Sequence, residues 1–222
     1  MFAGAVPELM DRPERVDFGA LDIAFDGTVL RPRPWTAMQS IWAAELAPSV
    51  GPGPILELCS GAGHIGLYAV VLSGRQLVQV DSEPAACRFA RLNADRAGIA
   101  DGVDIRCDDI ASALRPDERF PLIIADPPYV PSVDVSRFPE DPRPAIDGGP
   151  AGLDVILACL DVAAGHLSGD GACLLQVRGP GQLEALASLA DARPLVVADA
   201  RVHDDERAVA LVRRQPHASG RP

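Results

Sequence analysis

The chain has 222 residues, of which 48% are hydrophobic and 23% charged, a composition that suits one ordinary globular domain. Its formal net charge is −11 and all 20 basic residues are arginines, so its acidic surface disfavours unaided binding to bulk nucleic acid. No apolar run is long enough to span a bilayer, and the first residues, MFAGAVPELMDRPER, lack the basic start and long apolar core of a secretory signal. We therefore expect a cytoplasmic protein with no membrane partner.

The cysteines and histidines give no sign of a metal site. The five cysteines are scattered, odd in number and never spaced as C-x-x-C, which argues against a disulfide framework and against a zinc site. The four histidines are equally dispersed. We expect buried, reduced thiols and no bound metal. The cysteines are Cys59, Cys87, Cys107, Cys159 and Cys173.

Residues 1–53 are expected to form an N-terminal extension before the main domain. Residues 16–30 contain two short apolar runs on either side of Asp26-Gly27, a dipeptide typical of hairpin turns. Residues 37–47 place apolar side chains at helical spacing, and the proline- and glycine-rich residues 48–54 indicate a loop. The prediction is a short hairpin followed by one helix.

From residue 54 onward the pattern alternates between strands and helices. Predicted strands lie at 54–59, 76–81, 103–107, 121–126, 171–177, 194–202 and 207–214, and predicted helices at 64–73, 84–98, 153–167 and 181–190. Continuous apolar strands between amphipathic helices indicate a parallel sheet covered on both faces, and a short turn, HDDE, makes the last two strands antiparallel neighbours. We expect one doubly wound, seven-stranded α/β domain over 54–214 and a disordered tail over 215–222.

A glycine-rich turn follows the first of these strands. Gly61, Gly63 and Gly66 have the spacing G-x-G-x-x-G, which lets the backbone turn sharply and a ligand approach closely. The next strand ends at Asp81, where a carboxylate can accept hydrogen bonds from ribose hydroxyls. Dinucleotide sites share both features, and so do α/β proteins without a ligand. These features alone leave the ligand open.

Two further features favour a sulfonium amino-acid cofactor over a pyrophosphate. Glu57 precedes the glycines in the pattern acidic-x-x-x-G-x-G. The third strand ends in CDDI, so Asp108 or Asp109 supplies another carboxylate that can accept from an adenine amino group. The same aspartate would serve equally as a helix N-cap.

Six sequence blocks occur in order across most of the chain. They are VLRPRPWT (29–36), ILELCSGAGHIGL (55–67), VDSEPAACRFARLNADRAG (80–98), IRCDDIASAL (105–114), IIADPPYVP (123–131) and EDPRPAIDGGPAGLDVI (140–156). Taken together, they resemble the class I S-adenosylmethionine-dependent methyltransferases and, more narrowly, the HemK/PrmC-like glutamine methyltransferases. The resemblance implies a Rossmann-like fold with an antiparallel C-terminal strand, and S-adenosylmethionine as the cofactor.

The resemblance also implies roles for individual residues. The turn from Cys59 to Gly63 would wrap the methionine part of the cofactor, with Glu57 beneath it, and Asp81 would hold the ribose. Asp109, or its neighbour Ile110, would border the adenine. The implied cofactor residues are Glu57, Cys59, Ser60, Gly61, Ala62, Gly63, Asp81, Ser82, Asp108, Asp109 and Ile110. The implied catalytic residues are Asp126, Pro127, Pro128 and Tyr129.

The segment from Asp126 to Tyr129 has residue types that suit methyl transfer to a planar nitrogen. Such a nitrogen is a poor nucleophile because its lone pair is delocalised, so the protein must hold it in a reactive geometry. The side chain of Asp126 and the carbonyl of Pro127 can accept its two N–H bonds, while the prolines stiffen the loop and Tyr129 packs against the planar group. In isolation, the same residues would read as a rigid exit from a strand.

The chain departs from the glutamine methyltransferases in two ways. They carry Asn-Pro-Pro-Tyr, whereas Asp126 begins this motif, as is more typical of enzymes that methylate exocyclic amino groups of nucleic-acid bases. An ionised Asp126 would accept more strongly from an N–H group. The relatives that act on release factors also carry a helical N-terminal domain, and only about 50 residues precede the first motif here. Release factor is therefore in doubt as the substrate.

The sequence predicts an S-adenosylmethionine-dependent N-methyltransferase whose acceptor is an amide or amino nitrogen of a protein glutamine or a small molecule. Arg33, Trp35 and Thr36 would border the acceptor or pack over the cofactor. One alternative is a methyltransferase for an amino group of a nucleic-acid base. Another is a cofactor-binding subunit without catalysis. The oligomeric state stays open.

Overall fold

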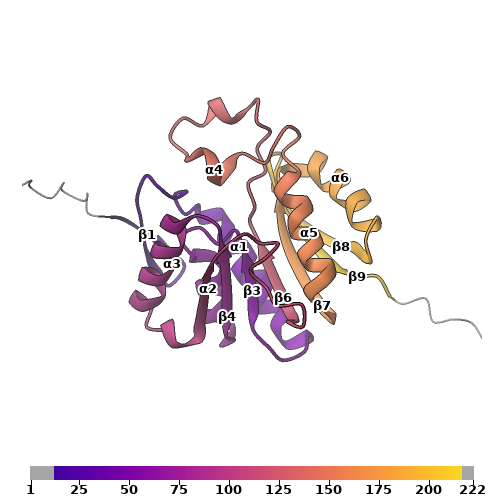
Figure 1. Cartoon of the computed structure of the whole chain (residues 1–222), viewed down its shortest axis with the longest axis horizontal. Helices are drawn as coiled ribbons and strands as arrows, with labels where there is room; N and C mark the ends of the chain where they lie inside the picture. The colour runs from indigo at the N-terminus through magenta and orange to yellow at the C-terminus, as the bar shows by residue number, and fades with distance from the viewer. Residues whose placement is uncertain (1–12, 217–222) are drawn as a thin grey trace, which may run out of the picture.

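The core of the molecule is one seven-stranded sheet with the strand order β5-β4-β3-β6-β7-β9-β8, in a computed structural model that describes residues 13–216 (Figure 1). Its strands are β3 (Ile55–Leu58), β4 (Leu77–Asp81), β5 (Val103–Cys107), β6 (Phe120–Ala125), β7 (Leu167–Val177), β8 (Leu195–Asp204) and β9 (Arg207–Arg214). The helices are α1 (Ala37–Leu46), α2 (His64–Ser73), α3 (Pro84–Arg96), α4 (Arg143–Ile146), α5 (Asp154–His166) and α6 (Gly179–Asp191). Strand β9 runs antiparallel to β7 and β8, and the other neighbouring pairs are parallel. The predicted fold is confirmed.

Helices cover both faces of this sheet. Trp42 of α1, Ile65 of α2 and Phe89 of α3 join the core on one face, and Ile156 of α5 and Leu186 of α6 join it on the other. All residues of β3 and β6 are buried for this reason. The strand order reverses between β3 and β6, and in such sheets the carboxyl ends at the reversal are open to ligands.

The N-terminal hairpin is present, but its turn lies elsewhere than predicted. Strands β1 (Glu14–Phe18) and β2 (Leu21–Phe25) pair across Gly19-Ala20 rather than across Asp26-Gly27. Gly19 has a φ of +59°, which suits a two-residue hairpin turn with glycine first. Asp26-Gly27 forms a separate turn after β2, closed by the N–H of Val29 on the carbonyl of Asp26.

The proline-rich residues 127–150, predicted as a loop, also contain the short helices η4 (Val135–Arg137) and α4. This segment extends beyond the carboxyl ends of the strands (Figure 1). The carboxylate of Asp147 accepts from Ser132 Oγ at 2.6 Å, from the N–H of Gly149 at 3.0 Å and from Arg143 Nη2 at 2.8 Å. These bonds lower the pKa of Asp147 and hold the segment in one shape.

Within residues 13–216, no helix is both long and apolar enough to cross a membrane. Of the predicted tail, only Gln215 and Pro216 belong to the described residues. The expectation about a secretory signal rests on residues 1–15, of which residues 1–12 lie outside the described part of the chain.

Candidate active site

Two cavities meet at the carboxyl edge of the sheet, beside the ends of β3, β4 and β6. One, of about 370 Å³, opens along the turn from Cys59 to Gly61, and we call it the glycine-turn cavity. The other, of about 300 Å³, opens beside Tyr129, and we call it the Tyr129 cavity. The residues that line both are Leu30, His64, Asp126, Pro128 and Ala145. Because the cavities share this wall, groups bound in the two cavities would be neighbours.

The turn after β3 adopts left-handed backbone conformations. Cys59, Gly61 and Gly63 have φ values of +57°, +54° and +82°. A Cβ atom on Gly63 would come within 2.8 Å of Gln79 Nε2, so this position needs glycine for space as well as for conformation. The turn brings Cys59, Ser60 and Gly61 into the wall of the glycine-turn cavity.

Glu57 is buried in β3 beneath this turn and joins it to α2. Its Oε1 accepts the N–H of Gly66 at 2.9 Å, and its Oε2 accepts from Gln79 Nε2 at 2.5 Å. Burial raises the pKa of Glu57 to about 8, although both hydrogen bonds act to lower it. A Cβ atom on Gly66 would collide with this carboxylate. Glu57 therefore supports the turn from below and does not line the cavity.

Asp81, at the end of β4, lines the glycine-turn cavity and is half-buried. Its Oδ2 accepts the N–H of Gly61 at 2.7 Å, and its Oδ1 accepts the N–H of Glu83 at 2.9 Å. Burial raises the pKa of Asp81, and the two backbone hydrogen bonds lower it. One carboxylate thus joins the turn to the start of α3 and also faces the cavity, where it can accept from ligand hydroxyls.

The two aspartates after β5 have different surroundings. Asp109 and Ile110 line the glycine-turn cavity. Asp108 lies outside the wall of this cavity. Its Oδ1 accepts from the N–H of Asp109 at 2.8 Å and from Ser112 Oγ at 3.0 Å. The structure therefore brings Asp109 to the cavity and uses Asp108 to close the turn that follows β5.

The structure thus brings most of the predicted cofactor residues into the wall of one cavity, and the others lie outside that wall. Those in the wall of the glycine-turn cavity are Cys59, Ser60, Gly61, Asp81, Ser82, Asp109 and Ile110. Those outside the wall are Glu57, Ala62, Gly63 and Asp108. Within residues 13–216, no cluster of three or more His, Cys, Asp or Glu side chains could hold a metal ion.

Asp126 follows the last residue of β6 and lies in the wall that both cavities share. Burial raises the pKa of its half-buried side chain to about 7. None of the hydrogen bonds found among residues 13–216 ends on this carboxylate, so nothing in the described chain offsets the loss of water. It is ready to accept from a ligand N–H group.

Two glutamines hold the backbone on either side of Asp126. The buried Gln39 of α1 donates through Nε2 to the carbonyl of Ala125 at 3.0 Å. Gln182 of α6 donates to the carbonyls of Tyr129 at 2.9 Å and Gly152 at 3.1 Å. The residues from Asp126 to Tyr129 are therefore fixed at both ends by helices from opposite faces of the sheet.

Tyr129 contributes a planar ring to the wall of the Tyr129 cavity. Burial raises the pKa of its phenol above the usual value, while the guanidinium groups of Arg207, Arg33 and Arg178 act to lower it. The hydroxyl therefore stays protonated at neutral pH and remains a hydrogen-bond donor. Pro127 is buried and lines the same cavity, beside Tyr129.

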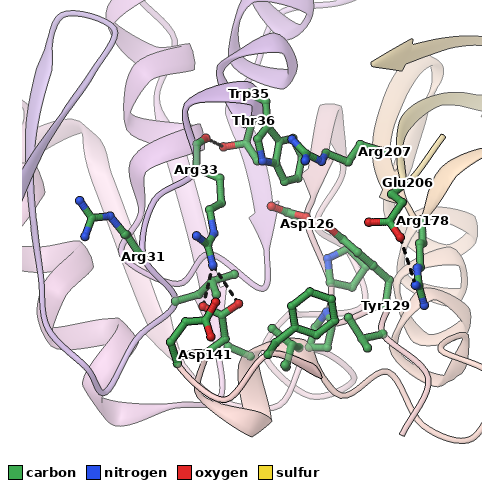
Figure 2. A pocket seen from close by; sticks show the side chains of 18 of the residues that line it. Arg31, Arg33, Trp35, Thr36, Asp126, Tyr129, Asp141, Arg178, Glu206 and Arg207 are labelled. Carbon is green, nitrogen blue, oxygen red and sulfur yellow. Dashed lines mark hydrogen bonds and ion pairs between the residues drawn. The ribbon is translucent and has the colours of Figure 1, made fainter. Parts of the chain in front are cut away.

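Arginines from distant segments reach the Tyr129 cavity (Figure 2). Arg33 donates to both carboxylate oxygens of Asp141, at 2.6 and 2.8 Å. The guanidinium carbon of Arg207 lies 5.1 Å from the ring centroid of Trp35, a cation–π contact. The structure thus places Arg33 and Trp35, both predicted from the sequence, in the wall of the cavity beside Asp126.

Thr36, the third predicted acceptor residue, also lines the Tyr129 cavity. Its hydroxyl donates to the carbonyl of Arg33 at 2.8 Å and lies 3.4 Å from His64 Nε2. Burial lowers the pKa of His64 to about 3. His64 is consequently neutral, and its Nδ1 has no hydrogen-bond partner among the described residues.

Sequence reasoning missed the residues that the second half of the chain brings to the Tyr129 cavity. Arg178 follows β7 and donates to Asp134 at 3.0 Å and to Glu206 at 3.4 Å. Glu206 and Arg207 come from the turn and first residue that connect β8 to β9. No local motif marks these residues, because only the pairing of β7, β8 and β9 brings them to the cavity.

The amino-acid sequence is similar to one family model and to several known methyltransferases. A family model described as "Conserved hypothetical protein 95" matches residues 23–137. A release factor glutamine methyltransferase of Moorella thermoacetica is 33% identical over 181 residues, which cover 79% of this chain and 63% of that protein. A ribosomal protein uL3 glutamine methyltransferase of Bradyrhizobium diazoefficiens is 32% identical over 128 residues, or 55% of this chain and 40% of that protein. This chain thus spans less than two thirds of either relative, and their names confirm the predicted resemblance.

A match among solved structures concerns the fold. The ribosomal protein L11 methylase of Lactobacillus delbrueckii subsp. bulgaricus aligns with a TM-score of 0.64 over 85% of this chain and 82% of that one, at 15% identity. An identity this low supports the fold alone. The chain has the Rossmann-like architecture found in methyltransferases.

Proposed function

This chain belongs to the family described as Conserved hypothetical protein 95, and we propose that it is an S-adenosylmethionine-dependent N-methyltransferase acting on the side-chain amide of a protein glutamine. The observation that carries the proposal is the place of Asp126, whose carboxylate faces both cavities and accepts no hydrogen bond from residues 13–216. A methyl donor in one cavity and a planar nitrogen in the other would meet beside it. The names of the sequence relatives support glutamine as the acceptor.

The glycine-turn cavity has a suitable set of groups for S-adenosylmethionine. A Cβ atom on Gly61 would meet open space, so the backbone there is accessible to a ligand. Asp81 offers carboxylate oxygens, and Ile110 and Val155 provide apolar surface. Asp81 would hold the ribose, the turn from Cys59 to Gly61 the methionine part, and Ile110 the adenine. When bound, the cofactor supplies a methyl group that its sulfonium has already activated.

The residues after β6 would hold the acceptor nitrogen. The carboxylate of Asp126 would accept one N–H and the carbonyl of Pro127 the other, which favours a more pyramidal and nucleophilic nitrogen. The two prolines keep these oxygens in place because their φ angles are restricted. Tyr129, which burial keeps protonated, would pack against the planar amide. This arrangement requires no general-base histidine, and His64 is neutral with a pKa of about 3.

Asp126 also favours a second candidate acceptor, the exocyclic amino group of a nucleic-acid base. A carboxylate accepts such N–H groups in a charge-assisted hydrogen bond, but it also repels a nearby phosphate. The formal net charge of −11 weighs against this candidate. Because the relatives are named for release factor and a ribosomal protein, we propose a protein partner and a cytoplasmic reaction.

The experiment that tests the proposal follows a labelled methyl group. The purified full chain is incubated with methyl-labelled S-adenosylmethionine and a bacterial lysate, and the products are digested with protease or nuclease. We expect protease-sensitive label on a glutamine side chain. Asp126→Ala should lower transfer at least about a hundredfold, as the loss of one preorganised polar group does in other active sites, with little change in calorimetric cofactor binding. Asp117→Ala, at a side chain that is 88% exposed, is the matched control.

The other outcomes separate the alternatives. Label released by nuclease would replace the proposed acceptor with a base amino group. Cofactor binding without transfer to any material would indicate a binding subunit. Absence of cofactor binding would contradict every version, and full activity of Asp126→Ala would show that this carboxylate does not hold the acceptor.

A further inference from the structure

Two thiols lie beside the glycine-turn cavity and have no role in the proposed reaction. Cys87 is in the first turn of α3, and Cys107 is the last residue of β5. Arg91, four residues after Cys87, donates through Nη2 to the carbonyl of Ile105 at 3.2 Å. Four helical residues rise about 6 Å and two strand residues about 6.6 Å. The start of α3 and the end of β5 therefore lie side by side, with Cys87 in one and Cys107 in the other.

Both cysteines also meet at the backbone of Asp81. The thiol of Cys87 donates to the carbonyl of Asp81 at 3.4 Å, and the N–H of Asp108 donates to the same oxygen at 3.1 Å. Cys107 is the partner of Asp81 in the pairing of β4 with β5. Burial, and then a hydrogen bond with the Cys107 thiol, raise the pKa of Cys87 to about 12. Both cysteines are thus held at the backbone of Asp81, Cys87 through its thiol and Cys107 through strand pairing.

Exposure distinguishes this pair from the other cysteines. Cys107 is exposed, contrary to the expectation that all the thiols are buried, and the other four, all within the described residues, are buried or half-buried. The neighbouring Cys159 thiol likewise raises the pKa of Cys59, but Cys159 is fully buried. A solvent oxidant therefore reaches Cys107 first, with Cys87 as the adjacent thiol.

We propose that Cys87 and Cys107 form a redox-modification site at which hydrogen peroxide produces a disulfide between α3 and β5. The Cys107 thiolate breaks the O–O bond of the peroxide and becomes a sulfenic acid, and the departing hydroxide takes up a proton to form water. The Cys87 thiol then attacks the sulfenic sulfur, forms the S–S bond and releases a second water molecule. Two thiols lose two electrons and two protons, and one peroxide is reduced to two waters.

The disulfide would change the glycine-turn cavity, an effect that rests on the proposed cofactor site. Cys87 follows Ala86, which lines this cavity, and Cys107 precedes Asp109 and Ile110 by two and three residues. An S–S bond of about 2.05 Å draws the Cys87 sulfur toward Cys107 and away from the carbonyl of Asp81. The cross-link thus shifts both segments that line the ribose and adenine side, and we expect weaker cofactor binding.

Mass spectrometry tests the modification itself. The reduced full chain is treated with hydrogen peroxide, its free thiols are alkylated, and trypsin releases peptides 76–88 and 107–119. We expect these two peptides linked by a disulfide that dithiothreitol cleaves, and alkylated thiols at the other three cysteines. Cys87→Ser and Cys107→Ser should each remove the link, whereas Cys173→Ala, a core position far from the pair in sequence, should retain it. Oxidation of Cys107 to sulfinic acid without a link would overturn the proposal.

Calorimetry with S-adenosylmethionine tests the coupling. Oxidised protein should bind at least about fivefold more weakly than reduced protein, a typical size for coupling between sites, and dithiothreitol should restore binding. Peroxide-treated Cys107→Ser should bind like the reduced chain. An unchanged affinity in the cross-linked protein would overturn the coupling. Absence of binding in both states, with the disulfide formed, would refute the proposed cofactor and leave the modification site standing.

Discussion

The two cavities are built in different ways. The glycine-turn cavity rests on contacts between residues close in the chain, such as Glu57 with Gly66, nine residues apart, and Asp81 with Gly61, 20 residues apart. The Tyr129 cavity rests on distant pairs, such as Arg33 with Asp141, separated by 108 residues. Local contacts therefore hold the turn that would bind the cofactor, while tertiary packing brings the arginines and their partners to the Tyr129 cavity.

The largest expected effect comes from filling the space beneath the glycine turn. Gly66→Ala would press a methyl group against the Glu57 carboxylate, and we expect it to lower the free energy of unfolding by about 2 to 3 kcal/mol, as overpacking does. Chemical denaturation would measure the change. Gly165→Ala, in α5 with open space around the new Cβ, is the matched control and should be neutral or slightly stabilising. Equal losses in both variants would contradict the special packing of Gly66.

The next effect concerns cofactor affinity. Asp81→Ala removes the carboxylate that holds Gly61 and Glu83 and faces the cavity. We expect calorimetry to show binding weaker by about 10- to 100-fold, which corresponds to the free energy of one or two charge-assisted hydrogen bonds. Asp117→Ala, at a side chain that is 88% exposed and outside the cavity wall, should bind within about twofold of the parent chain. If the two variants behaved alike, Asp81 would not be the ribose ligand.

A third prediction uses the pKa of about 7 at Asp126. Proton uptake below this pH removes the negative acceptor, so kcat/KM should fall about tenfold for each pH unit below 7 and level off above it. Asp126→Asn keeps an oxygen acceptor that does not titrate, and its profile should lack this limb. Initial rates at saturating cofactor between pH 5 and 8 would measure both profiles. An unchanged limb in the Asn variant would assign the titration to another group.

The smallest effect is expected from removing the side chain of Gln182, which holds the backbone of Tyr129. Gln182→Ala removes the hydrogen bonds to the carbonyls of Tyr129 and Gly152, which should loosen the loop and lower kcat about three- to tenfold, as the loss of about one net hydrogen bond would. Cofactor affinity should not change, because α6 does not line the glycine-turn cavity. Glu184→Ala, on the exposed side of the same helix, is the control. A loss of cofactor binding would contradict the division between the two cavities.

The same division explains what the sequence could predict. The glycines, Glu57 and Asp81 lie in one β-α-β segment, so their spacing was enough to expect a common site. Arg178 and Arg207 approach Tyr129 only after β7, β8 and β9 pair, and no spacing along the chain indicates this. The misplaced hairpin turn has a local cause: both Gly19-Ala20 and Asp26-Gly27 suit turns, and strand pairing selects the first.

The hydrogen bond from Gly61 to Asp81 has a consequence for the thermodynamics of ligand binding. The Asp81 carboxylate closes the turn by accepting the N–H of Gly61 at 2.7 Å, so the protein's own hydrogen bond fixes this part of the cavity wall. Little conformational entropy should be lost on binding, and the affinity should depend mainly on how well the ligand shares Asp81 with the backbone. A rigid ligand lacking hydroxyls would therefore lose enthalpy at this site without gaining in entropy.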